Sequence, residues 1–101
     1  MRTSTLIKVP VTDIAPNLTT RPVGIQARER LIQALNDYDL VEIDFLGKSL
    51  TPSFADECIG RLAATLGIQE FQKRVKMKNI NESTRPLIKH VILARCSTTK
   101  I

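Results

Sequence analysis

The sequence predicts a small α/β domain, with an open mixed sheet of three or four strands and helices stacked on one face. Segments with an apolar residue at every second position alternate with segments whose apolar residues recur every three or four positions. The predicted strands keep one polar face, so the helices must cover the other face. The chain has 101 residues, 43% of them apolar, which fits one domain spanning residues 1–101 with a modest core.

The first strand is predicted at residues 5–9, with Ile7 and Val9 on the same side of the extended chain. Pro10 lacks a backbone N–H, which indicates an edge position in the sheet. The polar residues that follow favour a loop, and a further short strand at residues 12–18 remains an alternative.

The first long helix is predicted to begin after Thr20, which is a suitable N-cap, with Pro22 in the first turn. The helix should end at Asn36 and Asp37. Its period predicts an inner face of Ala27, Leu31, Ala34 and Leu35 and an outer face of Arg28, Glu29 and Arg30.

A buried strand is predicted at residues 40–46, and Gly47 then breaks it. Its apolar side holds Val41, Ile43 and Phe45, and its polar side holds Glu42 and Asp44. The next helix is capped by Thr51 or Ser53, with Pro52 in its first turn, and Gly67 suits a left-handed stop. Its inward stripe consists of Phe54, Ala55, Cys58, Ile59, Leu62, Ala63 and Leu66.

A third strand is predicted at residues 71–79 from its period of two. Because a helix lies between this strand and the strand at residues 40–46, the two strands are predicted to be parallel and joined by a right-handed crossover. Its basic side chains would then lie opposite Glu42 and Asp44, as a partly paired solvated face or as a binding surface. Apolar or amide residues Val75, Met77 and Asn79 alternate with basic residues Arg74, Lys76 and Lys78.

Residues 81–84 predict a turn and a cap before the last helix, which begins near Pro86. The final residues, 97–101, are expected to fray. The inner face of this helix is predicted to hold Leu87, Ile88, Val91, Ile92 and Cys96.

The residues do not point to a specific reaction. The sequence contains none of the common glycine-rich phosphate loops, zinc-binding HExxH patterns or nucleophile elbows. His90 is the only histidine and falls on an outward helical position, while Cys58 and Cys96 are predicted to be inert buried thiols. Asp44, Asp56 and Glu57 could gather at the end of a strand, or the last two could stabilise the start of a helix. We therefore expect no enzyme, metal or cofactor.

The net charge of +5 is compatible with a nucleic acid, an acidic partner or solubility alone. The three Phe residues and one Tyr are not clustered with basic residues, which argues against a base-stacking surface. No apolar run approaches the length of a membrane span, and the N-terminal apolar patch is too short for a signal peptide. A cytoplasmic protein is the expectation.

The segment VEIDFLGKSLTPSFADECIGRLAATLG resembles the core of the STAS-like domain family of unknown function. That family has a strand ending in Asp-Phe and a helix start of the form Thr/Ser-x-Ser-Phe-Ala-Asp-Glu, which residues 53–57 match most specifically. RPVGIQARERL resembles its preceding helix and VKMKN its following strand. The resemblance covers roughly residues 21–79 and implies a STAS-like fold.

The resemblance also implies a regulatory protein–protein interaction module. In the related anti-sigma-factor antagonists, a partner kinase phosphorylates a serine at a strand–loop–helix junction, and relatives of the STAS-like family occur joined to histidine-kinase-like ATPase domains. Here Pro52 falls near the phosphoacceptor position, which puts a phosphorylation switch in question. The expected partner is a kinase-like ATPase or a transcription regulator; the alternative is a nucleic-acid-binding regulator that uses Arg74, Lys76 and Lys78. The expected partner-binding or switch residues are Lys48, Thr51, Ser53, Asp56, Glu57 and Asn79.

Overall fold

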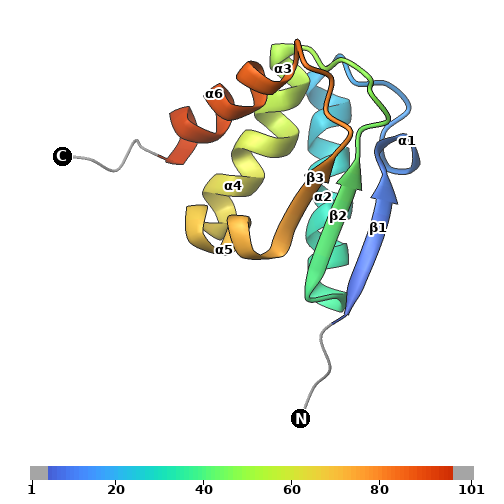
Figure 1. Ribbon diagram of the computed structural model, residues 1–101, viewed down its shortest axis with the longest axis vertical. Coiled ribbons are helices and arrows are strands. Elements are labelled where there is room, and N and C mark those ends of the chain that lie inside the picture. Colours follow the sequence, from blue (N-terminus) through green and yellow to red (C-terminus); the bar gives the residue numbers. More distant parts are fainter. Residues whose placement is uncertain (1–4, 97–101) are drawn as a thin grey trace, which may run out of the picture.

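The computed structural model describes residues 5–96, in which strands and helices alternate. Figure 1 shows the strands side by side and the helices packed against them. The elements in chain order are β1 (Leu6–Pro10), α1 (Val11–Ile14), α2 (Arg21–Asp37), β2 (Leu40–Asp44), α3 (Pro52–Ala55), the π-helical segment η1 (Asp56–Gly60), α4 (Arg61–Leu66), α5 (Ile68–Arg74), β3 (Val75–Lys78) and α6 (Arg85–Cys96).

The sheet has the order β1-β2-β3, and both strand pairs of the described part of the chain are parallel. Val41 at the centre pairs with Ile7 on β1 and with Val75 on β3. The predicted α/β class and small open sheet are confirmed, and Pro10 lies on an edge strand as expected. The expectation of a mixed sheet is wrong, because each connection contains helices that return the chain to the same end of the sheet.

The alternative strand at residues 12–18 does not form, because the chain turns into α1 directly after β1. Val11 and Ile14 of α1 and Leu18 of the next segment are buried. These apolar side chains reach the core from one helical turn and an irregular segment, and not from an extended strand.

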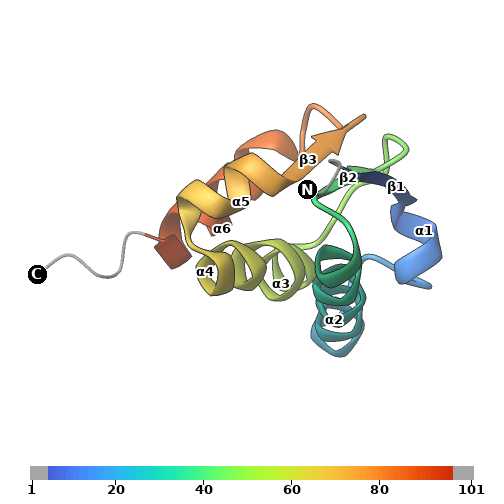
Figure 2. The same cartoon turned by 90° about the horizontal axis from the view of Figure 1, so that it is seen from below.

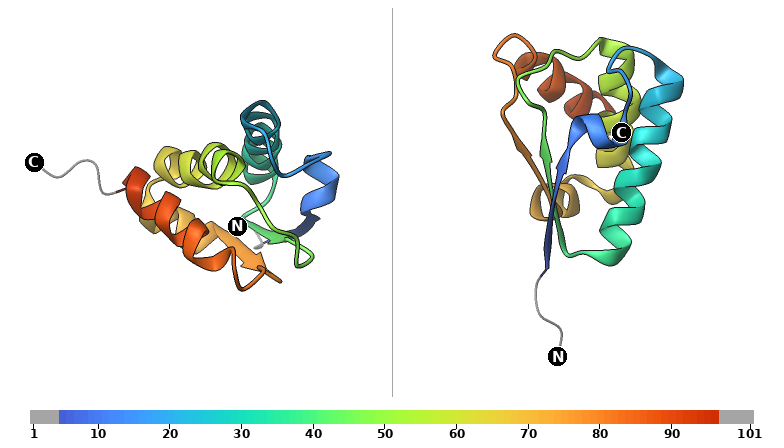
Figure 3. Two further views of the ribbon diagram at one scale, coloured as in Figure 1. Left: turned by 90° about the horizontal axis from the view of Figure 1, so that it is seen from above. Right: turned by 90° about the vertical axis from the view of Figure 1, so that its right-hand side faces the viewer.

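The helices cover one face of the sheet, as predicted. Figure 2 shows α2 and the α3–α4 helix beneath the strands, with α5 and α6 beside β3, and Figure 3 gives the same arrangement from two other directions. The core lies between these layers and confirms the inward stripe of the helix after β2 up to Ala63, with Leu66 partly buried at its edge. Its largest fully buried side chains are Phe45, Phe54, Leu31, Ile43, Ile59, Leu62, Val11, Val41 and Cys58.

Two of the predicted helix boundaries are confirmed by their local geometry. The side chain of Thr20 accepts a hydrogen bond from the backbone N–H of Val23 and caps α2. Gly67 ends α4 with a φ of 87°, a left-handed value that glycine adopts without a steric penalty. α5 begins on the next residue.

Residues 71–74 form the end of α5 and not a strand, so the third predicted strand begins too early. The guanidinium of Arg74 donates hydrogen bonds of 2.6, 3.0 and 3.0 Å to the carbonyls of Leu35, Tyr38 and Asp39, respectively. These carbonyls lie at and just beyond the end of α2, where backbone acceptors lack helical partners. Arg74 therefore links α5 to α2 and is absent from the basic face of the sheet.

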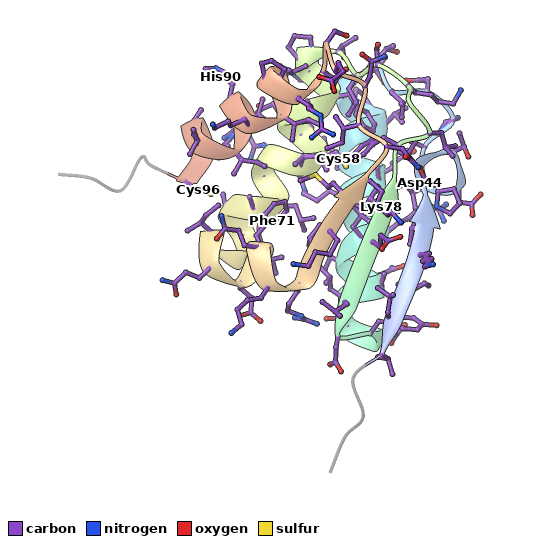
Figure 4. The ribbon with its side chains drawn as sticks, in the orientation of Figure 1. Asp44, Cys58, Phe71, Lys78, His90 and Cys96 are labelled. Atoms are coloured by element: carbon purple, nitrogen blue, oxygen red, sulfur yellow. The ribbon has the colours of Figure 1, made fainter. Side chains whose placement is uncertain are left out.

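The open face of the sheet is solvated and its charges are partly paired. Glu42 is the register partner of Lys76 and forms a 3.7 Å ion pair with Lys78. Lys76 also donates a hydrogen bond to the carbonyl of Gln72, and Figure 4 shows Asp44 close to Lys78 at the ends of β2 and β3. Arg74 is therefore not available for the proposed binding of a nucleic acid by this face. The other two residues of that interpretation, Lys76 and Lys78, lie beside carboxylates.

The thiols and the histidine lie apart from one another (Figure 4). Burial raises the pKa of the Cys58 thiol to about 12, so this thiol stays protonated at neutral pH. Cys96 is only partly buried, in contrast to the prediction, and His90 is exposed on α6 as expected. Among residues 5–96, no helix is both long enough and apolar enough to cross a membrane.

Candidate functional site

The first candidate region is the strand-end loop, residues 45–51, at the carboxyl end of β2. Leu46 and Gly47 both have positive φ values, 56° and 71°, and so does Asn79 after β3, at 55°. Positive φ is unfavourable for a non-glycine residue, and such strain concentrates at functional positions. The loop nevertheless has defined hydrogen bonds, which hold it against the end of β3.

Asp44 and Asn79 tie the ends of the two strands together. One carboxylate oxygen of Asp44 accepts hydrogen bonds from the backbone N–H of Leu46 and the side-chain amide of Asn79, both at 2.9 Å. The backbone N–H of Gly47 donates to the carbonyl of Asn79 at 2.8 Å. The amide of Asn79, followed by the N–H of Leu46, lowers the pKa of Asp44 below its usual value. Asp44 is therefore an ionised anchor of the loop.

A shallow cavity of about 370 Å³ lies beside this loop. Lys48 and Ser49 form one wall, and the segment after α1 forms the other, from Ala15 to Thr19. Thr51 joins the two walls, because its backbone N–H donates to Leu18 and its hydroxyl donates to the carbonyl of Thr19 at 2.7 Å. We call this feature the loop groove.

The cap of the helix after β2 is Thr51 and not Ser53. The Thr51 hydroxyl oxygen accepts a hydrogen bond of 3.2 Å from the backbone N–H of Phe54, and Pro52 takes the first helical position. Ser53 is the second helical residue, is half-buried, and makes no side-chain hydrogen bond within the described residues. The sequence allowed both caps because either residue type suits the position.

The second candidate region is an arginine–carboxylate cluster on η1. α3, η1 and α4 are consecutive and form one helix that carries a π-helical segment in its middle. Such segments are rare and often occur at functional sites. The cluster draws side chains from α2, η1, α4 and α6, and its members are Arg21, Arg28, Asp56, Glu57, Arg61 and Arg95.

Asp56 is bound mainly by Arg95. Two nitrogens of Arg95 donate to its two oxygens at 2.8 and 2.6 Å, and Arg21 adds a contact of 3.3 Å. These guanidinium hydrogen bonds, with that of Arg95 the strongest, lower the pKa of Asp56 to about 2 despite partial burial. Asp56 is therefore ionised at all physiological pH values.

Glu57 is the buried centre of the cluster, with only 7% of its surface exposed. Its carboxylate contacts Arg21 at 3.0 Å, Arg28 at 3.3 Å and Arg61 at 3.1 Å. Arg28 also donates to the backbone carbonyl of Glu57 at 2.6 Å. Gly24 makes this approach of α2 possible, because a Cβ at that position would lie 2.9 Å from the Cβ of Glu57.

The predicted cluster of Asp44, Asp56 and Glu57 does not form. Asp44 binds Asn79, whereas Asp56 and Glu57 bind arginines, and no group of His, Cys, Asp or Glu suited to a metal occurs in residues 5–96. The helix-start interpretation is also wrong, because the helix begins at Pro52 and both residues lie beyond its first turn.

The helical periodicity of the sequence did not identify the arginines of this cluster. Arg28 was assigned to the outer face of α2, yet its side chain is only 18% exposed and points to Glu57. The available signal was the pair Asp56 and Glu57 on a helix that is otherwise apolar on its buried side. Two adjacent carboxylates there require cationic partners from neighbouring elements.

The sequence model of a family described as a STAS-like domain of unknown function matches residues 24–85, which is more than half of the chain. This chain belongs to that family. The matched part of the STAS-like domain runs from α2 to the first residue of α6 and includes the strand-end loop and Glu57. Comparisons with curated proteins and with solved structures found no match.

The low pKa of Asp56 predicts acid sensitivity of the STAS-like domain. A carboxyl whose pKa is lower in the folded chain than in the unfolded chain adds stability above pH 4, and that contribution is lost as the pH falls towards 2. Asp56→Asn should therefore flatten the fall in unfolding free energy between pH 4 and pH 2, measured by urea denaturation. Asp44, whose pKa is also lowered, should supply part of the remaining slope. A variant slope equal to that of the wild type would contradict the role of the Asp56–Arg95 pair.

Proposed function

We propose that this STAS-like domain is a regulatory protein–protein interaction module, not an enzyme, and that the strand-end loop and the loop groove bind its protein partner. The observation that carries the proposal is a loop whose residues 46–49 are exposed and which is hydrogen-bonded to Asp44 and Asn79 at the carboxyl ends of β2 and β3. Ligands of open α/β sheets bind at this edge.

Leu46 supplies the apolar anchor of this surface. Leu46 is a large apolar residue with a positive φ, and it is 46% exposed. Its exposed side chain does not stabilise the folded chain. An exposed apolar side chain surrounded by polar residues matches the usual arrangement of a protein interface, with an apolar centre and a polar rim. Lys48 and Ser49 supply the polar rim, and the charge of Lys48 favours an acidic patch on the partner.

The resemblance to anti-sigma-factor antagonists favours a kinase-like ATPase or a transcription regulator as the partner. Ser53 is the better candidate for a phosphorylation switch than Thr51, because the Thr51 hydroxyl caps the helix and bonds Thr19. A phosphate on Ser53 would add negative charge at the start of α3, beside the strand-end loop. Asp56 and Glu57 belong to the arginine–carboxylate cluster and are not part of the proposed patch.

Leu46→Asn is the sharpest test, because asparagine tolerates a positive φ while removing the apolar anchor. We expect partner affinity to fall by at least tenfold, or about 1.4 kcal/mol, with an unchanged or higher melting temperature. The partner is first identified by affinity capture from the native cell, and its affinity for purified variants is then measured by calorimetry.

Leu93→Gln is the matched control, because Leu93 is 51% exposed on α6, outside the strand-end loop. It should leave affinity unchanged. In the same assay, Ser53→Asp should alter partner affinity more than Ser53→Ala does if Ser53 is the switch. Equal affinity for the wild type and folded Leu46→Asn would place the interface elsewhere.

A further inference from the structure

A second cavity, of about 270 Å³, opens beside the arginine–carboxylate cluster. Arginines from three different helices line it: Arg28 of α2, Arg61 of α4 and Arg95 of α6. Ala64 and Thr65 complete its wall. We propose that this cavity is a binding site for a phosphoryl group, separate from the partner surface proposed above.

The charges of the cluster favour an anion. Among residues 5–96, the four guanidinium groups of the cluster contact only two carboxylates, so positive charge predominates there and favours an anion such as phosphate. Asp56 and Glu57 are the carboxylates that contact these arginines within the described part of the chain. Their contacts hold the arginine side chains in place before a ligand arrives, which reduces the entropy cost of binding.

The arginines retain donors for a ligand. Arg28 contacts the carboxylate of Glu57 through one terminal nitrogen, and Arg61 contacts it through Nε. A guanidinium carries five N–H groups in a planar fork, so both residues keep N–H groups that can bind phosphoryl oxygens in pairs. The hydroxyl of Thr65 adds a further donor to the wall.

The backbone is shaped to bring the arginines together. The π-helical segment places Asp56 and Glu57 toward α6 and α2, respectively. Gly60 lets α6 approach, because a Cβ there would lie 3.1 Å from the carbonyl of Val91 and 3.2 Å from Cγ of Arg95. The rare π-helical segment and the close contact at Gly60 therefore both help to bring the arginine-bearing helices together beside the cavity. These two observations do not depend on the charge of the cavity.

The test is a titration of isotope-labelled protein with inorganic phosphate, followed by NMR at constant ionic strength with chloride as the balancing ion. We expect saturable shifts of the backbone amides of residues 61–65. Arg61→Gln should weaken phosphate binding by about tenfold or more, because it removes charged donors. Arg61 is the residue of choice because its side chain is 46% exposed, so the variant should fold.

Arg30→Gln is the matched control, since it removes the same charge from an exposed position on α2 outside the cavity. It should leave phosphate binding nearly unchanged. Equal weakening by both variants would indicate general charge attraction and overturn the site, as would shifts that fail to saturate in the millimolar range. Thr65→Ala should weaken binding less than Arg61→Gln, while its melting temperature reports on folding.

Two further titrations distinguish the source of the phosphoryl group. A phosphoserine peptide that binds more tightly than inorganic phosphate, while its unphosphorylated form does not bind, identifies a phosphorylated protein segment as the ligand. Equal affinities for the phosphopeptide and phosphate identify a small phosphate compound. If neither causes saturable shifts at residues 61–65, the proposal fails, and this outcome leaves the partner surface at Leu46 unaffected.

Discussion

Glu57→Ala should lower the free energy of unfolding by about 3–5 kcal/mol, because it leaves buried charge without a partner. Glu57 is 7% exposed and its carboxylate contacts three arginines, of which Arg28 has a side chain only 18% exposed. Arg28 would keep its bond to the backbone carbonyl at residue 57 but lose the opposite charge. Guanidinium chloride denaturation at neutral pH measures the loss.

Two variants separate this effect from a general loss of negative charge. Glu70→Ala removes a carboxylate that is 46% exposed and 3.9 Å from Arg74, so it should cost less than about 1 kcal/mol. Glu57→Leu combined with Arg28→Met should recover most of the lost stability, because an apolar pair replaces a buried ion pair at little net cost. A loss below about 1 kcal/mol in Glu57→Ala would show that the cluster does not stabilise the fold.

Phe45→Ala should cost a similar amount, about 3–5 kcal/mol, for a different reason. Phe45 follows β2 directly, is fully buried, and packs in the core between the sheet and the helices. Truncation to alanine removes its apolar contacts and leaves a cavity that the surrounding helices cannot fill completely. Its backbone N–H, which donates to the carbonyl of Lys78, is retained, so the loss measures the side chain.

Leu6→Ala is the comparison for Phe45→Ala, because Leu6 is also apolar but is 47% exposed on the edge strand β1. We expect it to cost well under the Phe45 value. Both variants are compared by chemical denaturation, with the dependence on denaturant checked for a common slope. A loss below about 1 kcal/mol in Phe45→Ala would contradict the shared core of β2 and the helix that follows it.

The two proposed sites differ in how closely the sequence anticipated them. Lys48 and Asn79 were predicted as site residues from the ends of the strands and the family resemblance, and the structure brings both to the strand-end loop region. Leu46 was not singled out, because its exposure and positive φ follow from the hydrogen bonds of Asp44 and Asn79. Asp56 and Glu57 were predicted as part of the same patch, but their carboxylates bind arginines from α2, α4 and α6.

The sequence by itself determined the features that depend on neighbours along the chain. The structure confirms four such features: the alternation of β2, the apolar stripe after Thr51, the Thr20 cap and the helix end at Gly67. Each depends on the backbone preferences and burial of residues close together in the sequence. Membership in the STAS-like family was also visible in residues 53–57 and their surroundings.

Tertiary structure alone decided the features whose partners lie far apart in the sequence. The alternation of residues 74–79 led to a predicted strand that starts at residue 71, yet residues 71–74 end a helix, and the guanidinium of Arg74 binds three carbonyls more than thirty positions earlier. Arg28 occupies a polar helical position, yet it points inward because Glu57 lies across from it. The periodicity of a segment indicates which of its side chains face the core. It does not indicate which charged group or carbonyl from a distant part of the chain will lie next to a given side chain.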